Sequence, residues 1–226
     1  MTDTIVFDLD GTLLNTLEDI TDSVDFALGE MGFPLRTAGE VRMMVGNSVD
    51  HLIHSALPEG HTEREFLECR EIYNRHYSGN MRNKTAPYPG VYEMLEAVRK
   101  AGYKTAVVSN KDDEFTAGLV KELFGDYIMV AVGKSPERPR KPAPDGVWHA
   151  LKLLGSAKEN AVYVGDSEVD ALTAKNSGLP CVGCLWGFRD RETLEKNGAD
   201  IIIKEPLELL EAVRTIDAGL SGGKER

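Results

Sequence analysis

The stretch "IVFDLDGTLLNT" at residues 5–16 joins a short apolar run to two closely spaced carboxylates. Ile5 to Phe7 have the character of a buried strand, and Asp8 and Asp10 follow at its end. An apolar run without polar alternation is typical of a strand covered on both faces in a parallel sheet. Binding sites of such sheets lie beyond the carboxyl ends of the strands. The stretch therefore predicts a parallel sheet with acidic groups at its functional edge.

Further short apolar runs follow from about residue 86 onward, and segments with apolar residues at helical spacing separate them. The runs are KTAVVS (104–109), YIMVAV (127–132), AVYVG (161–165), PCVGCL (180–185) and DIII (200–203). Strands that alternate with helical patterns are typical of a sheet with helices on both faces. The predicted fold class is therefore α/β, with a Rossmann-like three-layer core built on a parallel sheet.

Residues 17–85 interrupt this alternation, because they contain helix-like segments and no convincing strand. An insert of about 70 residues is too long for a loop and is long enough for a small domain. We therefore expect an all-α cap domain at 17–85, inserted into a core domain made of residues 1–16 and 86–226.

Composition limits the kinds of partner. The 226 residues carry a formal net charge of -11, which disfavours non-specific binding to nucleic acid or to anionic membranes. No stretch approaches the roughly 20 apolar residues of a membrane span. Three cysteines cannot all pair with one another, which suits a reducing compartment. We expect a cytoplasmic protein, monomeric or homodimeric, that acts on a small molecule.

Polar residues collect after four of the predicted strands. They are Asp8 and Asp10, then Ser109, Asn110 and Lys111, then Arg140 and Lys141, and finally Asp166 and Asp170. Carboxylates that converge without a counter-ion repel one another and shift one another's pKa values. A hard divalent cation such as Mg2+ resolves the repulsion, and Mg2+ commonly binds through few carboxylates together with water and substrate phosphate. The pattern predicts phosphate chemistry at a magnesium site.

The other polar residues of this edge suit a phosphoryl group. Ser109 and nearby backbone N–H groups can bind phosphate oxygens, and Lys141 adds a positive charge. A carboxylate that faces a phosphate can act as a nucleophile, while a second carboxyl group two residues along handles the proton. Asp8 and Asp10 have this spacing.

Four segments resemble, in order and spacing, the motifs of the haloacid dehalogenase-like (HAD) phosphohydrolases. They are DLDGT (8–12), VVSN (107–110), RKPAPD (140–145) and VGDSEVD (164–170). The helical insert resembles the cap of this family, and the likeness is strongest to its phosphoglycolate phosphatase-like branch. The resemblance covers essentially the whole chain.

The resemblance implies roles for these positions. Asp8 would be the nucleophile that forms an aspartyl-phosphate, and Asp10 would protonate the leaving oxygen and then activate water. Asp8, the backbone carbonyl of Asp10 and Asp166 would hold Mg2+. Asp170 is also assigned to the metal site, either as a ligand or through water or Lys141, and Lys141 would neutralise charge on Asp8 and the phosphoryl group.

The resemblance also implies substrate contacts in both predicted domains. In the core these are Gly11, Thr12, Ser109 and Asn110; in the cap they are Arg42, Gly46 and Asn47. Two neighbouring cap positions depart from the family pattern. Ser48 and Asp50 stand where phosphoglycolate-type relatives often have glycine and a basic residue.

The function implied is a Mg2+-dependent phosphatase, a phosphoric monoester hydrolase acting on a phosphoglycolate-like compound or a sugar phosphate. A pyrophosphatase or a phosphomutase of the same superfamily is the alternative. A phospho-accepting signalling module is the alternative from another class. In such a module the phosphorylated Asp should follow a central strand and no helical domain should interrupt the chain, so both features count against it.

Overall fold

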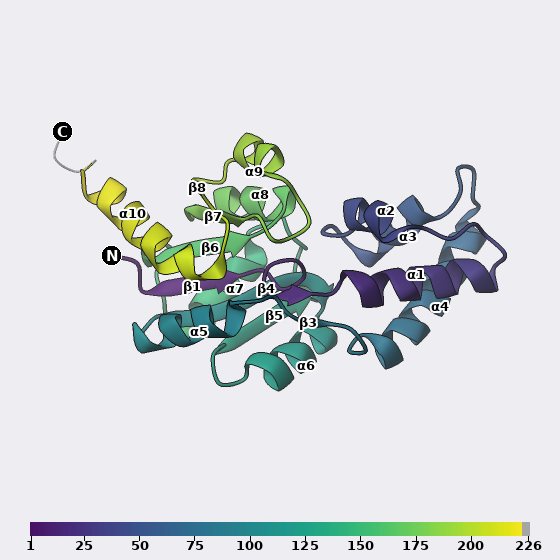
Figure 1. Ribbon diagram of the computed structural model, residues 1–226, viewed down its shortest axis with the longest axis horizontal. Helices are drawn as coiled ribbons and strands as arrows, with labels where there is room; N and C mark the ends of the chain where they lie inside the picture. The colour runs from purple at the N-terminus through teal and green to yellow at the C-terminus, as the bar shows by residue number, and fades with distance from the viewer. Residues whose placement is uncertain (223–226) are drawn as a thin grey trace. The chain divides into compact units, whose positions relative to one another are not determined.

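The computed structural model describes residues 1–222 and contains a six-stranded sheet (Figure 1). The strands lie in the order β5, β4, β1, β6, β7, β8, and all neighbouring pairs are parallel. Their bounds are β1 Thr4–Phe7, β4 Lys104–Asp112, β5 Val130–Lys134, β6 Ala161–Gly165, β7 Cys181–Cys184 and β8 Ile201–Ile203. The predicted parallel α/β core is confirmed.

Helices cover both faces of this sheet. Helices α5 and α10 lie on the face opposite α7 (Figure 1). The bounds are α5 Val91–Lys100, α6 Asp113–Phe124, α7 Asp145–Leu154, α8 Glu168–Ser177, α9 Arg191–Asn197 and α10 Leu209–Gly222, with 3-10 turns η1 Lys158–Asn160 and η2 Pro206–Glu208. The core therefore has the three layers that the alternating pattern predicts.

The apolar spacing of α7 explains its packing. Val147 and Leu151 lie on one side of the helix and pack with Val6 of β1 and Tyr163 of β6 in a buried cluster. Gly155 ends the helix with φ 61°, a left-handed conformation that favours glycine. This packing fixes α7 against the central strands β1 and β6. The polar residues of the site follow the carboxyl ends of these strands.

Two strands differ from the predicted runs. The run YIMVAV was expected to begin a strand at residue 127, but β5 begins at Val130, because the N–H groups of Tyr127 and Ile128 still donate to the Phe124 carbonyl oxygen in the turn after α6. Strand β4 continues past the predicted end at Ser109 to Asp112, with a shift of register between Val108 and Asp112. The irregular end of β4 carries three of the polar residues, and α6 begins only at Asp113.

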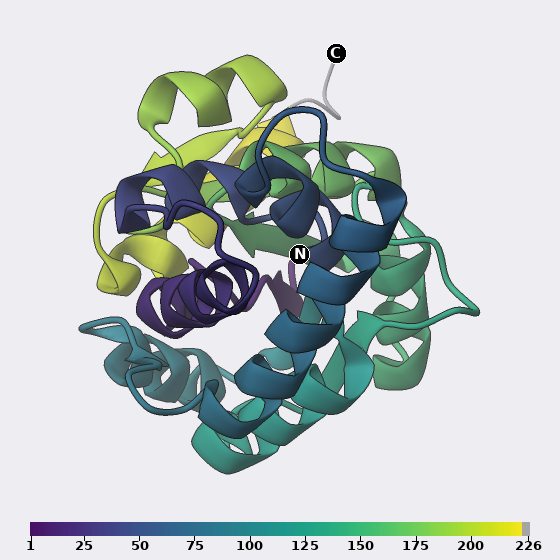
Figure 2. The same ribbon diagram turned by 90° about the vertical axis from the view of Figure 1, so that its right-hand side faces the viewer.

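The inserted helices form a compact unit of their own, Leu14–Ala86, while residues Met1–Leu13 and the chain from Pro87 onward form the other. The helices are α1 Leu17–Glu30, α2 Ala38–Met44, α3 Val49–Ala56 and α4 Glu63–Asn80. Figure 2 looks onto this unit, with α1 in purple and α4 in blue as long helices that pack together. Its interior contains Leu28, Ile53 and Phe66, all buried.

Short segments tie the helical unit together. Asp19 of α1 is buried, and its carboxylate accepts hydrogen bonds of 2.8–3.0 Å from the backbone N–H groups of Lys84 and Thr85. The two-residue strands β2 (Leu14–Asn15) and β3 (Ala86–Pro87) form a separate sheet. In the part of the chain that the structure describes, no helix has the length and apolar character needed to cross a membrane.

Candidate active site

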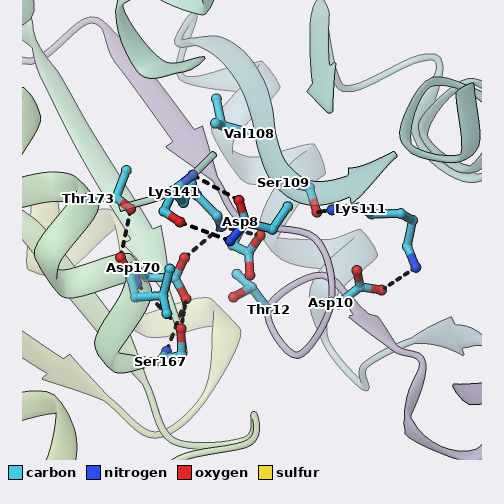
Figure 3. A network of polar contacts seen from close by, with 12 residues as sticks. Asp8, Asp10, Thr12, Val108, Ser109, Lys111, Lys141, Ser167, Asp170 and Thr173 are labelled. Atoms are coloured by element: carbon cyan, nitrogen blue, oxygen red, sulfur yellow. Dashed lines mark hydrogen bonds and ion pairs between the residues drawn. The ribbon is translucent and has the colours of Figure 1, made fainter. Parts of the chain in front are cut away.

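The carboxyl ends of three strands adjoin one another. Strand β1 pairs with β4 on one side and with β6 on the other. Asp8 directly follows β1, Ser109 lies in the irregular end of β4, and Asp166 directly follows β6. Parallel pairing therefore gathers residues that are far apart in the sequence at one edge, where they form a polar network (Figure 3).

Lys141 links two carboxylates in this network. Its Nζ lies 2.6 Å from Asp8 Oδ1 and 2.8 Å from Asp170 Oδ1, and it donates to the hydroxyl oxygen of Tyr163 at 3.1 Å. Only 4% of Lys141 is exposed. Burial by itself would lower the pKa of Lys141, but the carboxylates of Asp170 and Asp8 raise that pKa well above its usual value. Lys141 is therefore a buried cation at physiological pH.

The side chain of Asn110 fixes the backbone of Lys141. The Lys141 N–H donates to Asn110 Oδ1 at 2.8 Å, and Asn110 Nδ2 donates to the Lys141 carbonyl oxygen at 3.2 Å. Next to Asn110, the Ser109 hydroxyl accepts a hydrogen bond from the Lys111 N–H at 3.2 Å and is nearly buried. The end of β4 thus positions the loop that carries Lys141.

Both carboxylate oxygens of Asp170 are already engaged. Oδ1 accepts from Lys141 and from the Tyr163 hydroxyl, the latter at 3.2 Å. Oδ2 accepts from the Ser167 N–H at 3.0 Å, the Ser167 hydroxyl at 2.6 Å and the Asp166 N–H at 3.2 Å. Ser167 and Asp170 form a capping box at the start of α8. A carboxylate with this many donors is suited to orienting Lys141.

Asp166 is held by residues from two other segments. The Thr12 hydroxyl donates to Asp166 Oδ1 at 2.8 Å, and the Phe188 N–H donates to Asp166 Oδ2 at 2.8 Å. Burial, together with the charge of Asp170, raises the pKa of Asp166 to about 7. Gly11 has φ 94°, and a Cβ there would lie 2.4 Å from Asp166 Oδ2. Gly11 and the buried side chain of Thr12 therefore support Asp166 directly.

The carboxylates of Asp8, Asp166 and Asp170 are close enough to surround one ion. Each offers an oxygen, and these oxygens lie within 4.8 Å of one another in a buried position. Burial and the charge of Asp170 raise the pKa of Asp8 well above its usual value, although Lys141 opposes the shift. A divalent cation would relieve this excess of negative charge, and hard oxygen donors are what Mg2+ prefers. The residues present therefore fit a magnesium site.

Asp10 points toward a different lysine. Its carboxylate Oδ1 lies 3.2 Å from Lys111 Nζ, and Figure 3 shows this pair apart from the contacts of Asp8. The side chains of Lys111 and Asp10 are only 7% and 14% exposed. The sequence places Lys111 at this edge but assigns it no role in the site. The one available signal was its position directly after Asn110, at the end of the same apolar run.

The remaining predicted contacts lie on the helical unit. Arg42 is an exposed residue of α2, and Gly46 and Asn47 are half-buried in the turn that follows. Ser48 caps α3 by accepting a hydrogen bond from the His51 N–H at 3.1 Å. Asp50 lies 3.1 Å from Arg70 in an ion pair. The two positions that depart from the family pattern thus have partners within their own unit.

The fold and this cluster together define an α/β enzyme with its chemistry at the carboxyl edge of a parallel sheet. Residues 5–184 match the family described as haloacid dehalogenase-like hydrolase. This match spans more than half of the chain, and the chain belongs to that family. The resemblance seen in the sequence motifs is confirmed.

Named relatives agree with the family. A phosphoglycolate phosphatase of Pseudomonas syringae pv. syringae (strain B728a) is 30% identical over 95% of this chain and 80% of its own length. The phosphoglycolate phosphatase of Aquifex aeolicus (strain VF5) is 34% identical over 81% of this chain and 85% of its own length. A crystal structure from Lactobacillus delbrueckii subsp. bulgaricus, described as a candidate phosphoglycolate phosphatase, superposes with a TM-score of 0.90. It is 32% identical and covers 94% of this chain and 99% of its own.

These likenesses agree with the predicted type of enzyme. The chain is a hydrolase of the phosphatase type, similar to the phosphoglycolate phosphatases. The sequence-based expectation of an enzyme is therefore confirmed.

Proposed function

We propose that this chain is a Mg2+-dependent phosphatase that hydrolyses a phosphomonoester of a small metabolite through an aspartyl-phosphate on Asp8. The observation that carries the proposal is the contact between Lys141 and Asp8, because a buried ammonium 2.6 Å from a carboxylate oxygen orients that carboxylate and opposes the rise in its pKa that burial causes. Asp166 lies in the same carboxylate cluster.

In the first step an oxygen of Asp8 attacks phosphorus, and the bond from phosphorus to the leaving oxygen breaks. Asp10 donates a proton to that oxygen, so the alcohol leaves neutral. Lys141 offsets the charge that gathers on Asp8 and the phosphoryl oxygens. The Ser109 hydroxyl and the Asn110 backbone bind these oxygens, and the Gly11–Thr12 turn lies beside them.

In the second step Asp10, now a carboxylate, removes a proton from water, and the resulting oxygen attacks phosphorus. The bond between Asp8 and phosphorus breaks, inorganic phosphate leaves, and both aspartates return to their starting forms. Proton and phosphoryl group are therefore balanced over one cycle.

The proposed metal ligands are Asp8, the backbone carbonyl of Asp10 and Asp166. Asp170 supports this site by orienting Lys141 and through water, because both of its oxygens already accept hydrogen bonds. Bound Mg2+ would supply positive charge that neutralises the phosphoryl oxygens and permits two like charges to approach.

Phosphoglycolate-like compounds and sugar phosphates are the proposed substrates. The names of the similar phosphatases support the former. The departures at Ser48 and Asp50 keep sugar phosphates in the set to be tested. We assign specificity to the cap at residues 17–85, with Arg42, Gly46 and Asn47 as its substrate contacts, and phosphate chemistry to the core at residues 1–16 and 86–226.

A screen of phosphorylated metabolites tests this function. The purified chain is assayed for phosphate release with Mg2+ and with EDTA against phosphoglycolate, several sugar phosphates and pyrophosphate. Metal-dependent release from one or a few phosphomonoesters is expected. Conversion of one sugar phosphate into another without net phosphate would instead indicate a phosphomutase. An acyl-phosphate that persists for many minutes without turnover would indicate a signalling module.

A further inference from the structure

The segment that follows β7 contacts two parts of the site without belonging to the motifs that define it. It comprises Trp186, Gly187 and Phe188, and lies in the core unit. Gly187 and Phe188 are buried, and Trp186 is half-buried. Arg189, the next residue, is anchored to the start of α8 through Glu168, with Nε to Oε2 at 2.8 Å.

Two hydrogen bonds hold the carboxylate of Asp166, one on each oxygen. Phe188 supplies one of them through its backbone N–H, at 2.8 Å from Oδ2. The Thr12 hydroxyl supplies the other, at 2.8 Å from Oδ1. Because each oxygen has one fixed donor, the plane of the carboxylate is defined, and its remaining lone pairs have fixed directions.

The backbone of Gly187 lies directly against the same carboxylate. A Cβ at this position would lie 2.3 Å from Asp166 Cβ and 2.4 Å from the Gly11 carbonyl oxygen. These separations are far shorter than a van der Waals contact, so no side chain fits without moving Asp166 or the Gly11–Thr12 turn. The close approach therefore requires glycine.

Trp186 ties the segment to the turn after the predicted nucleophile. Its indole N–H donates to the Thr12 carbonyl oxygen at 2.9 Å. Both the side chain and the backbone of Thr12 are thus held, since its hydroxyl donates to Asp166 and its carbonyl oxygen accepts from Trp186. The turn that follows Asp8 is thereby bonded to Asp166, which follows a different strand.

We propose that Trp186, Gly187 and Phe188 form a positioning segment that fixes the Asp166 carboxylate and the Gly11–Thr12 turn, and so sets the affinity of the site for Mg2+. The inference rests on the metal dependence in the proposed function. Groups that orient metal ligands from outside typically change metal affinity by about 10- to 100-fold when they are lost. These three residues act through Asp166 and Thr12 and touch no reacting atom.

Trp186→Phe tests the proposal, and Trp148→Phe is its matched control. Both indoles donate to a backbone carbonyl, Trp148 to that of Ser177 at 3.3 Å, but Trp148 lies on α7 and is 49% exposed. Mg2+ binding is measured by titration calorimetry on the full chain. Trp186→Phe should raise the dissociation constant about tenfold, and Trp148→Phe should leave it unchanged. Gly187→Ala should raise the dissociation constant at least as much as Trp186→Phe.

A second readout separates positioning from a general loss of structure. In Trp186→Phe the Mg2+ concentration for half-maximal phosphatase activity should rise, while kcat at saturating Mg2+ stays within about twofold of the parent. Wild-type Mg2+ affinity in Trp186→Phe would overturn the positioning proposal alone. If the unsubstituted chain bound no Mg2+, the proposed metal dependence would fail, and the positioning proposal with it. Should Gly187→Ala fail to fold, Trp186→Phe still decides.

Discussion

The polar residues at the core edge differ in burial from the candidate residues of the helical unit. Asp166 and Asp170 are fully buried and Lys141 is nearly so, and each is held by several hydrogen bonds. Arg42, by contrast, is exposed on a helix, and Asn47 is half-buried in a turn. A buried network admits one arrangement, because any broken bond leaves an uncompensated polar group. A side chain at the surface stays in contact with water, so a substitution there leaves no buried polar group unpaired.

This difference separates two tasks. The core edge has the rigidity that a nucleophile and its proton donor need. The helical unit offers side chains that can change without a large cost in folding, which suits the choice of substrate. Substitutions in the core should therefore alter stability and chemistry together, while those in the helical unit should alter the ranking of substrates.

The largest effect is expected for Lys141→Met. Loss of this ammonium leaves the buried carboxylates of Asp8 and Asp170 uncompensated, so the free energy of unfolding in EDTA should fall by about 3–5 kcal/mol. Urea unfolding measures this. Lys134→Met is the control, because it breaks a more exposed ion pair with Asp112 and should cost about 1 kcal/mol or less. Equal losses in the two variants would contradict the assigned role of burial.

Lys111→Met should impair proton transfer. Lys111 contacts the Asp10 carboxylate, so its loss should misplace the proton donor. We expect kcat/KM for an alkyl phosphate to fall about 10- to 100-fold, and kcat/KM for an aryl phosphate with a good leaving group to fall much less, because that group needs little protonation. Steady-state kinetics on both substrates measure the difference. A uniform fall would count against a role through Asp10.

The pH dependence of Mg2+ binding follows from the raised pKa of Asp166, about 7. The folded protein keeps a proton on Asp166 that the unfolded chain loses above a pH of about 4, so this group stabilises the metal-free fold at low pH, and that contribution is lost as the pH rises to about 7. Mg2+ needs the carboxylate. The dissociation constant should be roughly tenfold higher at pH 6 than at pH 8.

Titration calorimetry at both pH values measures this ratio. Asp166→Asn removes both the titrating group and a proposed ligand, so Mg2+ binding should be weak at both pH values. An affinity independent of pH in the unsubstituted chain would contradict a protonated Asp166 in the metal-free protein.

The smallest effect is expected for Asn47→Ala in the helical unit. We expect kcat/KM to change by about three- to tenfold for the preferred metabolite, with aryl phosphate hydrolysis and Mg2+ affinity unchanged. Kinetics on a panel of phosphomonoesters measure the ranking. An equal loss on every substrate would point to a role of Asn47 in folding.

Much of the fold could be predicted from the sequence, because short apolar runs and helical spacing are local patterns. The buried run before Asp8 predicts a strand of a parallel sheet, and parallel strands send the residues that follow them to one edge. The order of strands is a different matter. That β4 and β6 both flank β1 depends on packing between distant segments, and no local pattern encodes it.

The features of the site that the sequence did not predict are individual side-chain contacts between residues that lie outside the four motifs or in different ones. Nothing near Asp10 in the sequence indicates that Lys111 reaches it, since the irregular end of β4 determines the contact. The hydrogen bond from Trp186 to Thr12 joins residues that are 174 positions apart in the sequence. The sequence does predict that Asp170 serves the site, but only the structure reveals how many donors its oxygens already accept.

The most direct test of the account is to trap the phosphorylated enzyme. The chain is mixed with Mg2+ and a phosphomonoester, quenched within milliseconds, reduced with borohydride and mapped by mass spectrometry. The account predicts that Asp8, and no other carboxylate, is converted to homoserine, that the reaction requires Mg2+, and that Asp8→Asn abolishes both the trapped species and turnover. Label on another residue, or turnover retained in Asp8→Asn, would contradict it.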